Sequence, residues 1–205
     1  MKRKLLTFVS VSCITAAFAQ QKGSFEMGAG IGFSGSSIYG DNFDPEVRNG
    51  FNTAISGEYY FSRAWGLKAK VAYDRKGYDQ VPLQHEGYIY ATNYSMDYIT
   101  IPVMANLHFG RTKNWYLNFG PYVGFLVASK EEGFDTPTTG MYNKTDAGLA
   151  YGIGVKIPVG SFVKIFIEFE GQGGMADVFK NTDAFYRNTT TSRVAFNTGI
   201  NFLLQ

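Results

Sequence analysis

Residues 99–109 read ITIPVMANLHF, and the order of side chains in this stretch decides the fold class. Its odd positions are all apolar, whereas its even positions are mixed, small and polar. Such strict alternation predicts a β-strand, because successive side chains of a strand point to opposite faces of a sheet. One face of this strand is therefore hydrocarbon, and the sequence must show whether that face meets a protein core or lipid.

Seven further stretches alternate in the same way, which gives eight candidate strands. The additional stretches are residues 25–34, 51–61, 65–74, 114–127, 147–157, 163–170 and 193–204. The mainly apolar face falls on odd positions in the first seven strands along the chain and on even positions in the last.

The connections between these strands alternate between long and short. Long loops are expected at residues 35–49, 77–94, 129–144 and 171–191, and tight turns at residues 62–64, 110–113 and 158–160. This pattern is typical of an antiparallel up-and-down transmembrane β-barrel, which has short periplasmic turns, long extracellular loops and both termini on the periplasmic side.

The polar face of the strands distinguishes two kinds of barrel. A soluble lipocalin-like barrel turns its hydrocarbon inward, whereas a membrane barrel turns it outward. Small residues suit a crowded lumen, and a water-exposed strand face would be expected to carry Thr, Lys and Glu instead. The polar face here is rich in glycine, namely Gly28, Gly30, Gly32, Gly120, Gly124, Gly148, Gly152, Gly154 and Gly199. The sequence therefore favours an all-β, eight-stranded transmembrane barrel.

The apolar face agrees with this choice. It carries no charge at its central positions in any of the eight stretches, and a Lys or Arg at the bilayer midplane costs roughly 2–4 kcal/mol in a membrane barrel. Aromatic residues collect near the strand ends, as the two interfacial girdles of such barrels require. These residues are Phe61, Trp65, Phe109, Trp115, Phe162 and Phe202 on the turn side, and Phe33, Phe51, Tyr73 and Tyr98 on the loop side.

The N-terminus has the features of a secretory signal peptide. Lys2, Arg3 and Lys4 precede an apolar stretch at residues 5–18, and Ala17-Phe18-Ala19 is a small-x-small cleavage site. We predict a signal peptide at residues 1–19 and one barrel domain at residues 20–205. Removal of the signal peptide lowers the formal charge from +2 to about −1 and takes away the only cysteine. The mature chain then has no disulfide and no basic excess that would suggest a nucleic-acid partner.

Charged residues on the polar face are expected to line the lumen. They are Glu26, Glu58, Lys68, Lys70, Asp74, Lys156, Lys164, Glu168, Glu170 and Arg193. We interpret them as structural charges that fill a lumen too narrow for a channel, with a proton or ion relay as the alternative. A turn centred on Arg63 would set Glu58 opposite Lys68. Lys156 and Lys164 would lie near each other and need an acidic neighbour such as Glu26 or Glu168.

Catalytic and metal-binding patterns are weak. The chain has two histidines, His108 on the lumen face and His85 in the second long loop. His85 with Ser95 is a conceivable nucleophile and base, but a loop histidine is usually only solvated. Residues 41–46 (DNFDPE) are rich in oxygen ligands but lack the spacing and glycine of a calcium loop. We therefore expect no enzyme activity, no catalytic residue, no metal and no cofactor.

Two stretches carry a family resemblance. Residues 98–110 (YITIPVMANLHFG) and 115–129 (WYLNFGPYVGFLVAS) resemble the PorT-like outer-membrane β-barrel family of Bacteroidota-type bacteria. Residues 146–155 (DAGLAYGIGV) and 197–202 (NTGINF) look like that family's later strands. The resemblance implies an outer-membrane location and, through the family's namesake, a link to protein secretion. The chain departs from many barrels in ending Leu203-Leu204-Gln205 after its last aromatic residue.

Three functions follow as hypotheses. The first is an integral outer-membrane protein with a plugged lumen that acts as a structural or interaction protein through four long extracellular loops. The second is an accessory component of an envelope secretion machinery, and the third is a small transporter or surface enzyme. Expected partners are outer-membrane lipid, the barrel-assembly machinery during biogenesis, and an envelope or extracellular protein at the loops. Pro102 lacks an N–H in a barrel without edges, so a bulge or a broken ladder is expected there.

Overall fold

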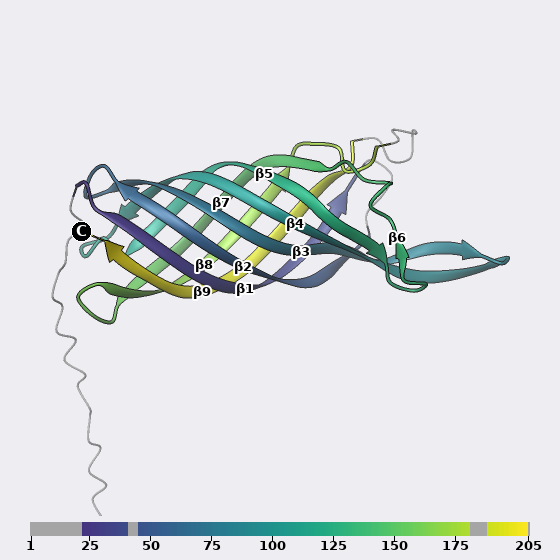
Figure 1. Ribbon diagram of the computed structural model, residues 1–205, viewed down its shortest axis with the longest axis horizontal. Coiled ribbons are helices and arrows are strands. Elements are labelled where there is room, and N and C mark those ends of the chain that lie inside the picture. Colours follow the sequence, from purple (N-terminus) through teal and green to yellow (C-terminus); the bar gives the residue numbers. More distant parts are fainter. Residues whose placement is uncertain (1–21, 41–44, 181–187, 205) are drawn as a thin grey trace, which may run out of the picture.

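The computed structural model describes residues 22–40, 45–180 and 188–204, and within them the chain forms one antiparallel sheet that closes on itself (Figure 1). The strands are β1 (Phe25–Tyr39), β2 (Glu46–Tyr60), β3 (Trp65–His85), β4 (Tyr88–Phe109), β5 (Trp115–Glu131), β6 (Thr136–Pro137), β7 (Thr145–Pro158), β8 (Val163–Gly174) and β9 (Thr190–Leu204). The order is β4-β3-β2-β1-β9-β8-β7-β5-β6, and pairing of β4 with β5 closes the ring. The two-residue β6 pairs only with the end of β5, so eight strands form the barrel.

The short turns lie where the alternation of the sequence predicts them. They connect β2 to β3, β4 to β5 and β7 to β8, at one end of the barrel. β1 begins and β9 ends at this same end, where Phe25 pairs with Leu204. We call this the turn end, and the opposite end the loop end. In the described part of the chain, no helix is long and apolar enough to cross a membrane.

The expectation of a second long loop at residues 77–94 is wrong. β3 continues to His85 and β4 starts at Tyr88, so most of this segment is a β-hairpin that extends past the ring (Figure 1). Glu86 and Gly87 form its two-residue turn with φ angles of 50° and 84°. Positive φ at both central residues is the geometry that suits the twist of a tight hairpin. The other long loops also begin later than expected, because their strands continue beyond the apolar stretches.

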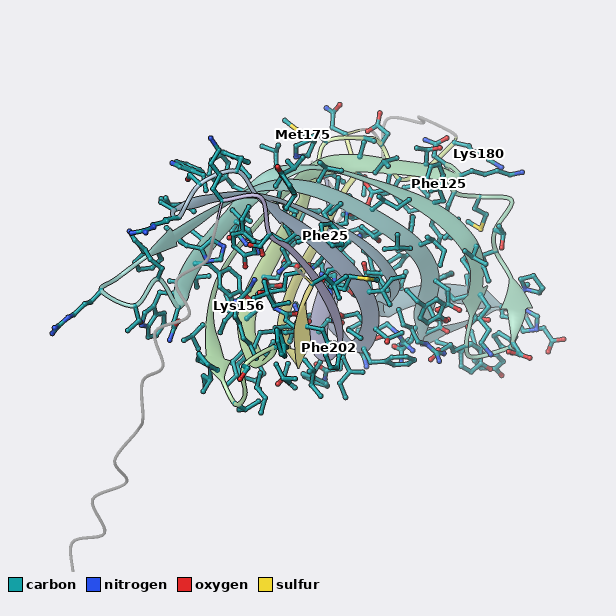
Figure 2. The ribbon with its side chains drawn as sticks, turned by 60° about the vertical axis from the view of Figure 1, so that its left-hand side comes forward. Phe25, Phe125, Lys156, Met175, Lys180 and Phe202 are labelled. Carbon is teal, nitrogen blue, oxygen red and sulfur yellow. The ribbon has the colours of Figure 1, made fainter. Side chains whose placement is uncertain are left out.

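Side-chain burial follows the predicted alternation and has the inverted sense of a membrane barrel. Large apolar side chains cover the outside, with Ile31 66% and Ile55 62% exposed. Polar side chains such as Thr100, Asn106 and His108 are fully buried inside. Figure 2 shows this arrangement, with Lys156 between the strands and Met175 and Lys180 on the segment that follows β8.

Tyr98 is the exception among the predicted girdle aromatics. Its side chain is only 1% exposed and points into the lumen, so its assignment to the loop-side girdle is wrong. The even parity of β4 already requires this direction, because Thr100 and Asn106 share its face.

Pro102 interrupts the ladder without a bulge. The register of β4 against β3 and β5 is the same before and after Pro102, and the register shift between β4 and β5 lies at Asp97 and Tyr98 instead. In the ladder between β4 and β3, Ile101 and Pro102 are not paired with a β3 residue. Of the two alternatives expected from the sequence, the structure has the broken ladder, because a missing N–H removes a bond without changing the residue count.

Candidate functional site

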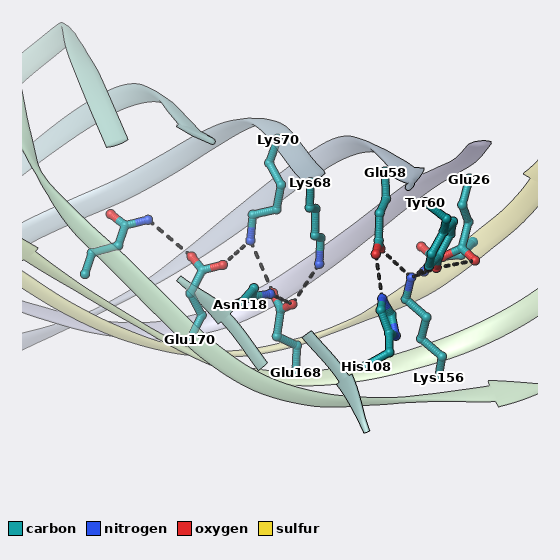
Figure 3. A network of polar contacts seen from close by, with 12 residues as sticks. Glu26, Glu58, Tyr60, Lys68, Lys70, His108, Asn118, Lys156, Glu168 and Glu170 are labelled. Carbon is teal, nitrogen blue, oxygen red and sulfur yellow. Dashed lines mark hydrogen bonds and ion pairs between the residues drawn. The ribbon is translucent and has the colours of Figure 1, made fainter. Parts of the chain in front are cut away.

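The lumen is the largest concentration of chemically active side chains in the described part of the chain. All ten charges that were assigned to the lumen from the sequence are buried there. They form separate clusters along the barrel axis, two of which appear in Figure 3. Each cluster brings together side chains from strands that are distant in the sequence.

The turn-end cluster is built around Lys156 of β7. Its ammonium group donates hydrogen bonds to Glu58 Oε2 at 2.7 Å and to the Tyr60 hydroxyl at 2.8 Å, and it also contacts Glu26. Lys164 donates to Glu26 Oε2 at 2.7 Å. Glu26 is thus the acidic neighbour that the two lysines were expected to share, and Glu168 is not.

His108 belongs to this cluster as well. Its Nε2 lies 2.6 Å from Glu58 Oε1, and its ring stacks obliquely on Tyr60, with ring centroids 5.1 Å apart. The side chain is fully buried. The histidine therefore has a satisfied structural position against a carboxylate.

The central cluster pairs β3 with β8 across the lumen. Lys68 contacts Glu168 at 2.8 Å, and Lys70 contacts Glu168 at 3.3 Å and also Glu170. Arg193 of β9 bridges Glu170 at 2.8 Å and Asp74 at 2.9 Å. The bonds of Lys68 and Lys70 to Glu168 join residues 100 and 98 positions apart in the chain.

Glu58 and Lys68 lie opposite each other as expected, but they do not form an ion pair with each other. The register does set Glu58 opposite Lys68. The Lys68 ammonium nevertheless binds Glu168, while Glu58 binds Lys156. In a narrow barrel, long side chains reach across the lumen, so the nearest opposite charge need not be on the adjacent strand.

A loop-end cluster was not found from the sequence. Lys76 Nζ lies 3.4 Å from Asp146 Oδ2 and over the rings of Tyr98 and Tyr122. Tyr122 and Thr191 both donate to the same carboxylate oxygen. Lys76 and Asp146 lie at even positions just beyond the apolar stretches of their strands. Since the even positions of these strands face the lumen, this parity could have predicted that both side chains point inward.

Above this cluster, an apolar plug closes the loop end of the lumen. Tyr78 and Tyr142 are buried with their hydroxyl oxygens 2.5 Å apart, and the ring of Phe179 lies 5.3 Å from that of Tyr142. The whole plug consists of Ile38, Tyr78, Tyr94, Met96, Tyr98, Leu126, Tyr142, Val178 and Phe179. Tyr142 and Phe179 come from connecting segments, where no periodicity marks a residue as buried.

The charges of the lumen balance. Six cations (Lys68, Lys70, Lys76, Lys156, Lys164 and Arg193) face six carboxylates (Glu26, Glu58, Asp74, Asp146, Glu168 and Glu170), and each cation lies within 4 Å of at least one of them. An isolated buried charge is costly, so mutual pairing is what allows so many ions in a closed space. The arrangement fills and neutralises the lumen.

Other chemistry finds no support in the described residues. They contain no group of three or more side chains suited to hold a metal ion. His85 pairs with Tyr88 at the tip of the hairpin, whereas Ser95 pairs with Gly77 near the ring, so this conceivable catalytic pair does not converge. Most of the oxygen-rich stretch at residues 41–46 lies outside the described residues.

Comparison with known proteins agrees with this architecture. Among solved structures, the outer membrane protein OprG from Pseudomonas aeruginosa is similar with a TM-score of 0.54 and 12% identity, over 91% of this chain and 98% of that one. Neisserial surface protein A has a TM-score of 0.52 and 15% identity, over 88% of this chain and 99% of its own. At these identities the likeness shows the fold alone. No curated protein matches the sequence.

A family model supplies the assignment. The model described as "Outer membrane protein beta-barrel domain" matches residues 18–180, which is most of the chain. The match agrees with the closed ring, the apolar outer face and the polar lumen. The chain belongs to the outer membrane protein β-barrel domain family and is a protein of the outer membrane.

Proposed function

We propose that this protein is a non-enzymatic interaction barrel that binds other proteins at its loop end, with that end outside the cell and both termini in the periplasm. The supporting observation is the contrast between its two parts. The lumen is filled by a neutral ion-pair network and an apolar plug. The loop end instead projects a hairpin with exposed Tyr88, Ile89 and Tyr90, which are 68%, 76% and 46% exposed.

The lumen argues against transport. A conducting pore needs a continuous aqueous path, whereas here buried ion pairs occupy the turn end and the middle of the barrel. We expect the purified barrel in a planar bilayer to give no single-channel steps. Steady single-channel conductance through the wild-type barrel would support the transporter instead.

Exposed aromatic side chains beyond the membrane favour binding. Contiguous apolar surface on a water-exposed element marks interaction sites, and Tyr is enriched in such interfaces. Phe134 joins the patch by packing on His85, with ring centroids 4.5 Å apart, and edge-on against Tyr90. The patch is thus held together by its own contacts.

The test uses the absence of cysteine from the predicted mature chain. The variant Tyr88→Cys places a thiol at the loop end. The control Val159→Cys places one at the turn end, on the β7–β8 turn, where Val159 is 56% exposed. A membrane-impermeant maleimide should label position 88 in intact cells and position 159 only after the outer membrane is opened. The reverse pattern would overturn the orientation.

Crosslinking at the same two positions tests partner binding. A photoreactive side chain at position 88 should give one discrete adduct with another envelope or extracellular protein in living cells, and position 159 should not give that adduct. Absence of any adduct specific to position 88 would contradict the interaction role. If the adduct co-purifies with a large secretion complex, the protein is the accessory component that its PorT-like resemblance implies.

A further inference from the structure

We propose that the outer edge of β4 in the projecting hairpin is a docking site for an extended segment of another protein, which adds to it as a further antiparallel strand. This inference rests on the proposed interaction role and names where and how the partner binds. Above the ring, and among the residues that the structure describes, the two strands of the hairpin pair only with each other: β2 leaves β3 at Asp79, and β5 leaves β4 at Tyr94. Its two outer edges are therefore candidates for strand addition.

The backbone groups available on β4 follow from the ladder. The carbonyl of Asn93 accepts a hydrogen bond from the amide of Glu132, so Asn93 points away from β3. Hydrogen-bonding direction alternates along a strand, and the β4 register is regular from Tyr88 to Thr92. Ile89 and Ala91 therefore point their N–H and C=O groups away from β3, and in the described part of the chain no second strand pairs with them on that outward side.

The two edges of the hairpin differ in one decisive residue. On β3 the outward positions are Pro82 and Gln84, since Val81 and Leu83 pair with Thr92 and Tyr90. Pro82 has no N–H, and proline on an edge is a common device that prevents strand addition. The β4 edge carries no proline and no charge between Tyr88 and Asn93. Only the β4 edge is thus open.

A second copy of this chain fits this edge poorly. Two barrels in one membrane both run β4 toward the bilayer, so their β4 edges would meet in parallel, which is the less stable pairing. An antiparallel contact would need the β3 edge of the neighbour, where Pro82 removes a donor. The occupant that satisfies the edge is an extended strand from a different protein.

Side chains beside the edge indicate the chemistry of that strand. Tyr88 and Tyr90 flank one face of the edge, and Ile89 and Ala91 lie on the other. In strand addition the main-chain bonds supply affinity, and the alternate side-chain contacts supply specificity. An uncharged segment that alternates β-branched and small polar residues would match both faces.

The experiment adds a synthetic peptide to the full-length barrel in lipid nanodiscs. The probe is an acetylated and amidated peptide of alternating Val and Thr, and amide hydrogen exchange is measured residue by residue. We expect protection at Ile89 and Ala91 to rise at least tenfold, with Gln84 unchanged. The same peptide with N-methyl groups on alternate residues should give no protection, because its donors are blocked.

Two variants complete the test. Ala91→Pro removes one outward donor and should weaken peptide binding at least tenfold, whereas Gln84→Pro, at an outward position on β3, should leave binding unchanged. Equal binding by both variants, protection on the β3 edge, or no protection at all would overturn the proposal. The adduct from position 88 in cells tests partner binding independently, so if that adduct persists while the peptide fails, the interaction role stands and edge addition is wrong.

Discussion

At the scale of single residues, the buried ion pairs carry a large desolvation cost. Desolvating two charges takes several kcal/mol per ion, and their mutual attraction offsets this only when geometry and hydrogen bonds are good. Lys76 and Asp146 form the simplest case, because Asp146 is the only carboxylate within 4 Å of Lys76 among the described residues. The consequence of removing one partner is therefore easiest to observe here.

We predict that Asp146→Asn destabilises the barrel by about 3–5 kcal/mol, since it leaves the Lys76 charge buried without a counter-ion. The double variant Asp146→Asn with Lys76→Met should recover much of that loss. Urea unfolding of the folded barrel in detergent micelles measures both. The matched control is Asp135→Asn, which breaks the exposed pair with Lys130 and should leave the unfolding midpoint unchanged. Equal midpoints for the single and double variants would contradict this assignment.

Glu131 lies at the loop end of β5, outside the membrane-spanning part of the strand, and its titration predicts how the stability of the following turn depends on pH. Burial raises the pKa of Glu131, but hydrogen bonds from the Thr92 hydroxyl and from the amides of Phe134 and Gly133 outweigh it and hold the pKa below its ordinary value of 4.5. A lowered pKa means that the carboxylate stabilises this turn above pH 4.5 and that the stabilisation is lost as pH falls through the lowered pKa.

The amide signals of Gly133 and Phe134 in NMR spectra should therefore stay constant from pH 7 down to 4.5 and shift only at lower pH. In Glu131→Gln the same signals should not titrate. A transition of the wild-type signals above pH 4.5 would show that the hydrogen bonds do not dominate.

At the scale of the element, the contact of β4 with β5 near Pro102 leaves no room for a side chain on β5. A Cβ atom at Gly120 would lie 2.2 Å from the Val103 carbonyl oxygen and 2.8 Å from the Met104 Cα. Both atoms are backbone, so neither can rotate away. The glycine at this position allows the strands to approach where the ladder between them is incomplete.

Gly120→Ala should therefore lower the free energy of unfolding by about 1–3 kcal/mol, because it forces backbone shifts in a packed ladder. Gly173→Ala is the control, since a Cβ atom there meets nothing within 4 Å. Heat-modifiability on gels ranks the two variants: Gly120→Ala should unfold at lower temperature than wild type, and Gly173→Ala at the same temperature. Matching temperatures for both variants would contradict the close approach.

At the scale of the whole molecule, the barrel and its hairpin are structurally separable. Residues 82–91 pair within the hairpin, and none of them belongs to the lumen ion pairs or to the apolar plug. Replacing residues 82–91 with a two-residue Asn-Gly turn keeps the Val81–Thr92 pair beside the turn and should leave the urea midpoint of the barrel unchanged within experimental error. The same deletion should abolish the crosslinked adduct in cells when the photoreactive side chain is placed at Phe134. Loss of folding would show that the hairpin is part of the barrel's stability.

How much of this structure the sequence predicts depends on how far apart in the chain the interacting residues lie. Alternation is local, so residues 99–109 alone predict a strand, its two faces and the burial of His108. The tight turns are also local. Residues 77–94 were expected to be a loop. The sequence carries no strong local signal for the hairpin observed there, because Glu86-Gly87 is not one of the Asn-Gly, Asp-Gly or Gly-Gly pairs that mark a two-residue turn, and Tyr88-Ile89-Tyr90 does not alternate apolar with polar residues.

The sequence by itself determined the number of strands in the ring, the face of each strand and ten of the twelve charges buried in the lumen, all except Lys76 and Asp146. Only the tertiary structure decided which charges meet, because strand tilt and curvature bring Lys68 to Glu168 across the lumen and leave Glu58 to Lys156. It also placed Tyr142 and Phe179 in the plug, since connecting segments have no period that marks an inward side. Faces are set by the two-residue repeat of each strand, whereas partners are set by how the whole sheet closes.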